Sequence, residues 1–136
     1  MAYQVSREIE FCYGHRLPNH GGKCRFLHGH NGRVEILIEA EKLDPDGMVL
    51  DFGEIRSGIE KWIDEELDHH TLLFQEDPLV PLLKDAGQKV VVMDAIPTAE
   101  NIAKFICLKG REMGLNIVQV RVWETSKNSA VYSAEC

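Results

Sequence analysis

Two stretches of alternating polar and apolar residues decide the fold of this 136-residue chain. They are Val5-Ser-Arg-Glu-Ile-Glu-Phe-Cys-Tyr-Gly-His15 and His28-Gly-His-Asn-Gly-Arg-Val-Glu-Ile-Leu-Ile-Glu-Ala40. Residues two apart in a strand share a face, so each stretch predicts a half-buried β-strand. His15, His28 and His30 have the parity of the apolar residues in their strands. We therefore expect the three imidazoles on the apolar face, unless Asn31-Gly32 contains a bulge that reverses the register.

Three imidazoles on one face predict a metal centre. His28 and His30 are two residues apart, and side chains at that spacing converge in a strand but diverge in a helix. Neutral imidazole is the commonest zinc ligand, and three protein nitrogens leave a fourth position open for a substrate oxygen. The alternative is three unrelated histidines, which their shared face disfavours.

Length and composition indicate one domain, residues 1–136, because 44% hydrophobic content supports one core and no linker divides the chain. We expect a cytoplasmic protein without membrane contact, since there is no apolar run of about 18 residues and no apolar N-terminal signal region. The four scattered cysteines are expected to be free thiols. A net charge of −7 argues against a nucleic-acid partner. Arg16, Lys23 and Arg25 lie in or beside one loop, where they either attract an anionic substrate or are ordinary solvated side chains.

The remaining pattern predicts an α+β fold: an antiparallel sheet with helices packed on one face. A first helix begins at Asp51 and buries a stripe at helical spacing, formed by Ile55, Ile59, Trp62, Ile63 and Leu67. A second begins at Pro97-Thr98, ends at Gly114 and buries Ile102, Phe105, Ile106 and Met113. Residues 117–124 and a short terminal segment complete the strands. The stretch from Gln75 to Asp94 is interrupted by prolines and has no assigned role, although Gln88 to Met93 fits a short strand.

Cys24 precedes His28 by four positions, and a thiol near a cation and basic side chains is driven toward thiolate. If its sulfur binds the metal, the site is closed, tetrahedral and structural. If the sulfur stays off the metal, it is a candidate general base. The residues alone leave both interpretations open.

Other candidate residues are acidic or lie beside acids. Asp68 and His69 form a carboxylate–imidazole pair suited to a proton relay, or simply a polar helix end. Glu124 has inward parity at the end of a valine-rich strand, where its carboxylate can accept two adjacent N–H donors of a heterocycle, or else turn to solvent. Thr98 and Glu100 fit either a pocket beside Glu124 or an ordinary helix start.

Together these residues resemble the superfamily of 6-pyruvoyl-tetrahydropterin and 6-carboxytetrahydropterin synthases. The matching motifs run in family order along nearly the whole chain: Phe11-Cys-Tyr-Gly-His15-Arg-Leu, Cys24-Arg-Phe-Leu-His28-Gly-His30, Leu50-Asp-Phe52, Leu67-Asp-His-His70, Pro97-Thr-Ala-Glu-Asn101 and Glu124-Thr125. Three residues between the cysteine and the His-Gly-His element are typical of the carboxy type, whereas the pyruvoyl type usually has five.

The resemblance implies the tunnelling fold, in which four-stranded antiparallel sheets, each with two helices on one face, join into a barrel of three subunits, and two trimers stack as a hexamer. It implies that His15, His28 and His30 hold Zn²⁺. Cys24 would abstract a proton, and Asp68 with His69 would complete the relay from a neighbouring chain. Glu124 would anchor the pterin ring, with Thr98 and Glu100 nearby.

The implied substrate is 7,8-dihydroneopterin triphosphate, whose side-chain oxygens would bind zinc. The carboxy type releases triphosphate and acetaldehyde on the route to 7-deazaguanines such as queuosine. A pyruvoyl-type synthase or related pterin side-chain lyase is the alternative within the superfamily. A structural-zinc or pterin-binding protein without turnover is the alternative from another class.

Overall fold

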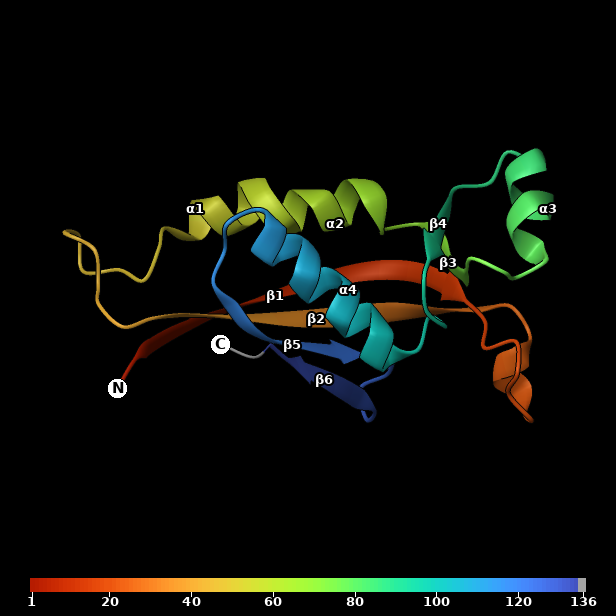
Figure 1. Ribbon diagram of the computed structural model, residues 1–136, viewed down its shortest axis with the longest axis horizontal. Helices are drawn as coiled ribbons and strands as arrows, with labels where there is room; N and C mark the ends of the chain where they lie inside the picture. Colours follow the sequence, from red (N-terminus) through yellow and green to blue (C-terminus); the bar gives the residue numbers. More distant parts are fainter. Residues whose placement is uncertain (135–136) are drawn as a thin grey trace.

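The computed structural model describes residues 1–134, in which six strands form one mixed sheet in the order β4-β3-β1-β2-β5-β6 (Figure 1). Their bounds are β1 Tyr3–His15, β2 His28–Ala40, β3 His70–Phe74, β4 Val90–Met93, β5 Ile117–Trp123 and β6 Ser129–Ser133. The pairs β1–β2, β2–β5 and β5–β6 are antiparallel. Strand β3 pairs parallel with both β1 and β4. The α+β class is confirmed. The expected sheet of four antiparallel strands has two strands too few, because β3 and β4 extend the sheet beyond β1.

The two long strands have the register that the alternating pattern requires. His15 lies opposite His28 and Tyr13 opposite His30, and the pairing of β1 with β2 continues without a shift through Asn31-Gly32. The irregularity in β2 lies instead at its other end, between Leu37 and Ile38 on the side of β5. All three histidines therefore keep inward parity.

The first predicted helix is confirmed as a continuous run of helical turns: α1 Phe52–Ile55, a π-helical turn Arg56–Glu60 and α2 Lys61–Glu66. Asp51 begins it by accepting a hydrogen bond from the N–H of Gly53 at 2.7 Å. Ile55, Ile59 and Ile63 are fully buried against the sheet. The π-helical turn does not interrupt this apolar stripe.

The second predicted helix is α4, Ala99–Glu112, which Thr98 caps by accepting from the N–H of Asn101 at 3.2 Å. Gly114 follows with a φ of +91°, a value that glycine adopts without strain. Ile102 and Ile106 are fully buried, as expected. Met113 is 41% exposed, so its predicted burial is wrong: the helix ends there and Leu115 packs against the core on the way back to β5.

The unassigned segment contains α3, Leu79–Asp85, followed by the predicted short strand β4. Pro78 is the residue before α3 and Pro81 lies in its first turn, where a missing N–H costs no helical hydrogen bond. The prolines that seemed to interrupt this segment therefore begin a helix.

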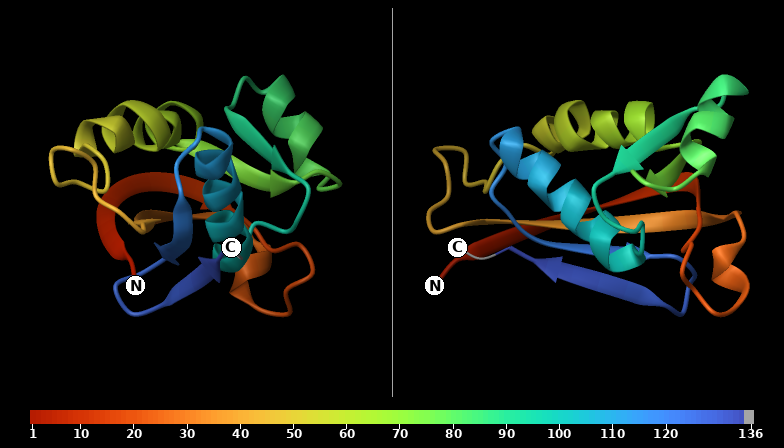
Figure 2. Two further views of the ribbon diagram at one scale, coloured as in Figure 1. Left: turned by 60° about the vertical axis from the view of Figure 1, so that its left-hand side comes forward. Right: turned by 45° about the vertical axis from the view of Figure 1, so that its right-hand side comes forward.

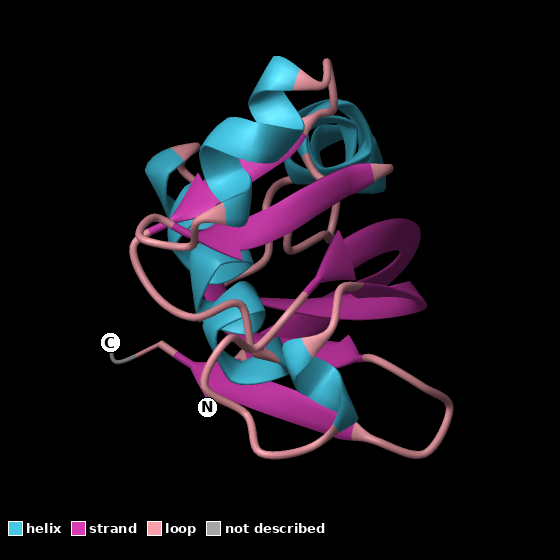
Figure 3. Cartoon of the chain, turned by 90° about the vertical axis from the view of Figure 1, so that its right-hand side faces the viewer, coloured by secondary structure: helices cyan, strands magenta, loops and turns pink. Residues whose placement is uncertain are grey.

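The helical run of α1 and α2 and helix α4 cover the same face of the sheet, and the core lies between them (Figure 2). The opposite face carries mostly polar and charged residues. Figure 3 views the molecule from the end at which β1 finishes and β2 begins, where the three histidines lie. Among residues 1–134, no helix combines the length and apolarity needed to cross a membrane.

Candidate functional site

Three imidazoles lie together on the inward face of the sheet, at the end where β1 finishes and β2 begins. His15, His28 and His30 each offer a ligand nitrogen, and these nitrogens all lie within 4.8 Å of one another. The Nε2 atoms of His15 and His30 are 3.1 Å apart. We call these residues the histidine group. Its geometry fits a metal ion with three nitrogen ligands and at least one free coordination position.

Two backbone carbonyls orient the rings. Nδ1 of His15 lies 2.7 Å from the carbonyl oxygen of Pro97, and Nδ1 of His28 lies 2.7 Å from that of Phe26. A carbonyl only accepts hydrogen bonds, so each Nδ1 carries the hydrogen and each Nε2 keeps its lone pair for the centre of the group. Such a hydrogen bond from the ring nitrogen that does not face the metal is typical of metal-binding histidines.

The surroundings also favour the protonation state that binds metals. His15 is 1% exposed, and burial lowers its pKa below the ordinary value, although the Pro97 carbonyl and Glu124 act in the other direction. Burial likewise lowers the pKa of His30. Both rings are therefore biased toward the neutral form.

Cys24 lies in a single 3₁₀ turn, Lys23–Arg25, in the loop between β1 and β2. Within the described part of the chain, the group of converging ligand atoms contains the three histidines and not the Cys24 sulfur. The geometry thus favours the interpretation in which the thiol stays off the metal.

Glu124 follows β5 and connects the histidine group to a neighbouring cavity. Its carboxylate oxygens lie 3.9 Å from Nε2 of His15 and 4.0 Å from Nε2 of His30. The cavity has a volume of about 240 Å³, and its lining includes Thr98, Glu100 and Glu124. The structure therefore brings the three predicted substrate-binding residues to one hollow beside the histidine group.

Asp68 and His69 form an adjacent pair between α2 and β3. Nδ1 of His69 is 2.7 Å from Oδ2 of Asp68, and the backbone of Cys12 holds both residues: its N–H donates to Oδ1 of Asp68 at 2.8 Å, and its carbonyl accepts from the N–H of His69 at 2.6 Å. Burial raises the pKa of Asp68, but the Cys12 N–H and His69 outweigh it and hold that pKa below its ordinary value.

The His69 side chain is 75% exposed, and its residue has a φ of +60°, a region that non-glycine residues adopt at a cost. It lines a cavity of about 580 Å³ whose lining includes His28 and His30 as well as Cys12, Gly29 and Asn31. The last three have outward parity, so the cavity lies at the end of the strands, where residues of both parities reach it. Within one chain, the structure therefore brings His69 into a hollow with two of the predicted metal ligands, whereas Asp68 lines a separate hollow with Glu10 and Arg33.

Two features near the site were not predicted. Arg16 pairs with Asp77, whose side chain is fully buried, so its guanidinium is not simply a free attractor of anions. The hydroxyl of Tyr13 is buried without a hydrogen-bond partner among the described residues, and burial raises its pKa. The Tyr13 ring needs the glycine at Gly32, because a Cβ there would lie 2.7 Å from the ring atom Cε1. Parity placed Tyr13 inward, but no sequence signal paired Arg16 with Asp77.

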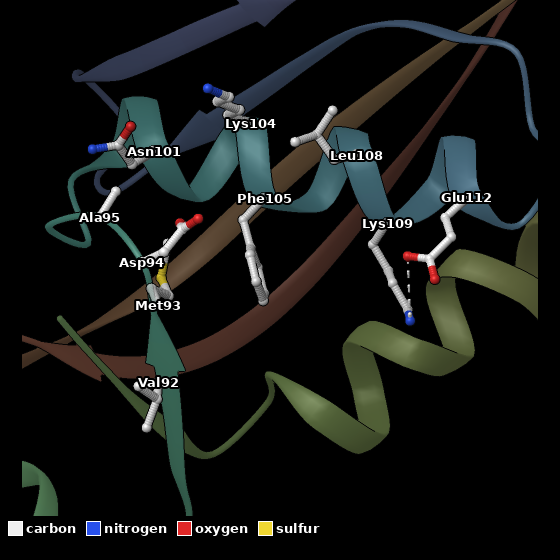
Figure 4. A pocket seen from close by; sticks show the side chains of 10 residues that line it. All are labelled: Val92, Met93, Asp94, Ala95, Asn101, Lys104, Phe105, Leu108, Lys109 and Glu112. Carbon is white, nitrogen blue, oxygen red and sulfur yellow. Dashed lines mark ion pairs between the residues drawn. The ribbon is translucent and has the colours of Figure 1, made fainter. Parts of the chain in front are cut away.

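A further cavity of about 440 Å³ lies between β4 and α4 (Figure 4). Phe105 points into it, and the Lys109–Glu112 ion pair, at 3.8 Å, lies at one end. The ten residues that line this cavity include none of the predicted site residues.

The fold is shared with solved structures. An uncharacterised protein of Wolinella succinogenes superposes with a TM-score of 0.81 and 27% identity, covering 99% of both chains. The 6-pyruvoyl tetrahydropterin synthase of Caenorhabditis elegans superposes with a TM-score of 0.74 and 24% identity, covering 99% of this chain and 97% of the other. The second likeness is evidence of the fold alone.

Sequence comparison defines the family. The family model described as 6-pyruvoyl tetrahydropterin synthase matches residues 4–135. A protein of Rickettsia felis named 6-carboxy-5,6,7,8-tetrahydropterin synthase is 49% identical over 102 residues, covering 74% of each chain. An Aquifex aeolicus protein of the same name is 32% identical and covers 99% of this chain and 100% of its own length. The chain belongs to the 6-pyruvoyl tetrahydropterin synthase family.

Proposed function

We propose that this protein is a zinc-dependent 6-carboxy-5,6,7,8-tetrahydropterin synthase. It would convert 7,8-dihydroneopterin triphosphate to carboxytetrahydropterin, acetaldehyde and triphosphate, in the formation of 7-deazaguanines such as queuosine. The observation that carries this proposal is the histidine group with Glu124 and its cavity directly beside it. The names of the curated relatives and the Cys24–His28 spacing support the carboxy type.

In this proposal the histidine group holds Zn²⁺ through the three Nε2 atoms. The bound ion supplies Lewis-acid chemistry, because it polarises substrate oxygens and stabilises the negative charge that develops on proton removal. The carbonyls of Pro97 and Phe26 keep the His15 and His28 rings in the ligating tautomer. Their role is to fix the site before the substrate arrives.

Glu124 would hold the pterin ring. A carboxylate has two oxygens that match two adjacent N–H donors on the edge of the heterocycle, and such charge-assisted pairs fix orientation as well as affinity. Glu124 lines the cavity and reaches to within 4 Å of the histidine group, so a ring bound there would extend its side chain toward the metal ligands. Thr98 and Glu100 would form the wall of the same pocket.

Cys24 would accept the carbon-bound proton, and Asp68 with His69 would relay it. The His69 side chain is 75% exposed in a hollow that His28 and His30 also line, and this exposure supports an active site completed by a second chain. We accordingly propose the homohexamer of two stacked trimers, with Asp68 and His69 of one subunit serving Cys24 of another.

Product analysis tests this function. The zinc-loaded protein is incubated with 7,8-dihydroneopterin triphosphate, and mass spectrometry follows the pterin product while acetaldehyde is trapped as a hydrazone. Acetaldehyde in equal amount to carboxytetrahydropterin is the expected result. The family model's description makes a pyruvoyl-type synthase the second candidate, and triphosphate release without acetaldehyde would select it. Zinc binding without turnover would select a structural-zinc or pterin-binding protein.

Cys24→Ala is the matched variant. The proposed enzyme keeps its zinc and its assembly in this variant but loses turnover, because the sulfur is not a ligand. A closed structural site would instead lose metal and stability.

A further inference from the structure

We propose that Arg16 and Asp77 are positioning residues for Cys24: the buried carboxylate holds the guanidinium, and through it the start of the loop whose backbone fixes Cys24. This inference rests on the proposed role of Cys24 as proton acceptor. It gives a role to the segment between Gln75 and Asp94, which carries no predicted site residue.

The Arg16–Asp77 pair is a two-pronged contact. Nε of Arg16 donates to Oδ2 of Asp77 at 2.7 Å, and a terminal nitrogen of the same guanidinium donates to Oδ1. Oδ1 also accepts from the N–H of Leu79 at 2.9 Å, at the start of α3. The Asp77 side chain is fully buried and that of Arg16 is 22% exposed. A planar fork held at two oxygens leaves the guanidinium little freedom.

The contact reaches Cys24 through one residue. Leu17 follows Arg16, and its N–H donates to the carbonyl of Cys24 at 2.8 Å. Leu17 also lines the cavity that contains Glu124. A displacement of Arg16 would therefore move both the backbone of Cys24 and one wall of the proposed pterin pocket.

The loop of residues 17–25 has little else to hold it. Among the described residues, its hydrogen bonds join loop residues to one another, as in His20 to Leu17 and Arg25 to Gly22, or to Phe26 directly after the loop. No side chain from 16 to 27 is buried. A segment with few buried contacts opens at low cost, so an anchor at Arg16, directly before the loop, influences where the residues between it and β2 lie.

The test measures kcat, KM and zinc content of the metal-loaded enzyme with 7,8-dihydroneopterin triphosphate. Asp77→Asn removes the charge of the carboxylate, and Arg16→Lys keeps the positive charge but loses the fork. Both should lower kcat about 10- to 100-fold, since a misplacement of about 1 Å costs about that much, while KM changes less and zinc stays stoichiometric. The double variant should be no worse than the more affected single variant, because both act through one contact.

A second readout does not depend on turnover. The rate at which iodoacetamide modifies the Cys24 thiol, followed by mass spectrometry of the Cys24 peptide, should change at least about threefold in both variants. Hydrogen exchange at residues 17–25 should accelerate in both. If Asp77→Asn fails to fold, Arg16→Lys gives the answer alone, since its side chain is partly exposed and its charge is kept.

Arg7→Lys is the matched control. Arg7 lies in β1, which ends one residue before Arg16, and pairs with Glu60 of the helical run at 3.1 Å, so the change weakens a comparable Arg–carboxylate contact without a path to Cys24. Its kcat and its Cys24 modification rate should stay within about twofold of the parent. An equal loss in Arg7→Lys would reduce the effect to general stability and overturn the inference.

The two proposals fail separately. If Cys24→Ala retains turnover, the proposed role of Cys24 is wrong. If Cys24→Ala is inactive but Asp77→Asn and Arg16→Lys keep the parental kcat, only the positioning role is wrong. Loss of zinc together with activity in the two variants would also overturn it, because the pair would then support the metal ligands rather than Cys24.

Discussion

The histidine group and the Asp68–His69 pair are built in opposite ways, although both stand at the same end of β1. The histidine rings are packed on the inward face, and two of them are fixed by carbonyls from the chain itself. His69 is three-quarters exposed on a strained backbone, held by hydrogen bonds to Cys12. The histidine group has its three converging ligand nitrogens within one chain, whereas His69 is open to a group that approaches from outside.

The largest expected effect tests whether the inward group is one metal centre. His28→Ala should reduce bound zinc well below one per chain and lower turnover at least about 10³-fold, because the Lewis-acid contribution disappears with the ion. Elemental analysis and steady-state kinetics measure both. His20→Ala is the control, since this exposed histidine of the loop between β1 and β2 is outside the group. Stoichiometric zinc in His28→Ala would mean that the three rings do not act together.

The next effect tests the Asp68–His69 pair. Asp68→Asn should lower kcat about 10²- to 10⁴-fold, the usual contribution of a proton-transfer residue, while zinc content is unchanged. Asp68→Asn and Cys24→Ala are then unfolded, mixed in equal amounts and refolded with zinc.

If each active site is shared between two chains, about a quarter of the active sites in the mixture should recover activity. These are the sites that combine an intact Cys24 with an intact Asp68 from another chain. A mixture as inactive as its components would contradict the shared site. Refolded parent protein is the control for recovery.

The Glu124 side chain is 28% exposed beside the histidine group, and its substitution should have a smaller effect than that of Asp68. Glu124→Gln keeps the size of the side chain but leaves one acceptor oxygen, so product affinity should fall about 10- to 100-fold, the contribution of a hydrogen bond to a charged group. Isothermal titration with the product measures it. Glu124→Gln that binds product as tightly as the parent would remove the anchor role, and Glu100→Gln tests the neighbouring wall of the cavity.

The histidine group should make the unfolding free energy of the protein depend on pH in the acidic range. His15 and His30 have lowered pKa values in the folded chain, so between those values and the ordinary 6.5 the unfolded chain binds protons that the folded chain refuses. The unfolding free energy of the metal-free protein should therefore fall as pH drops below about 6.5, by up to about 1.4 kcal/mol per pH unit for each ring. Denaturant titrations at pH 7.5, 6.5 and 5.5 measure the slope. His15→Asn should flatten it, whereas a slope unchanged in that variant would assign the dependence to other groups.

The sequence predicted those features of each region that depend on residues close together in the chain, and it missed those that depend on residues far apart. Alternation within β1 and β2 placed His15, His28 and His30 on one face, because side-chain parity is a local property of a strand. The Pro97 carbonyl that orients His15 lies 82 residues away, and no local pattern indicates it.

The same reason explains what was missed in the sheet. The parallel pairing of β1 with β3 joins Tyr13 to His70 across the whole first helical run. Asp77 is 61 residues from Arg16, and its acidic side chain between turn residues is locally indistinguishable from a solvated one. Sequence patterns therefore predicted the antiparallel strands and the faces of their residues, but of the edge that β3, α3 and β4 add they indicated only the short strand within Gln88 to Met93.

The smallest effect tests whether the Asp68–His69 pair stores backbone strain. The φ of +60° at His69 costs a non-glycine residue about 1 kcal/mol or more, and glycine adopts it freely. His69→Gly should therefore raise the unfolding free energy by up to about 1 kcal/mol, less what the lost contact with Asp68 contributed, while turnover falls. His70→Gly, one residue later at the start of β3, should be destabilising, because that position has an ordinary strand conformation. If His69→Gly is destabilised as much as His70→Gly, the unusual backbone is not strained and the Asp68–His69 pair is as relaxed as the histidine group.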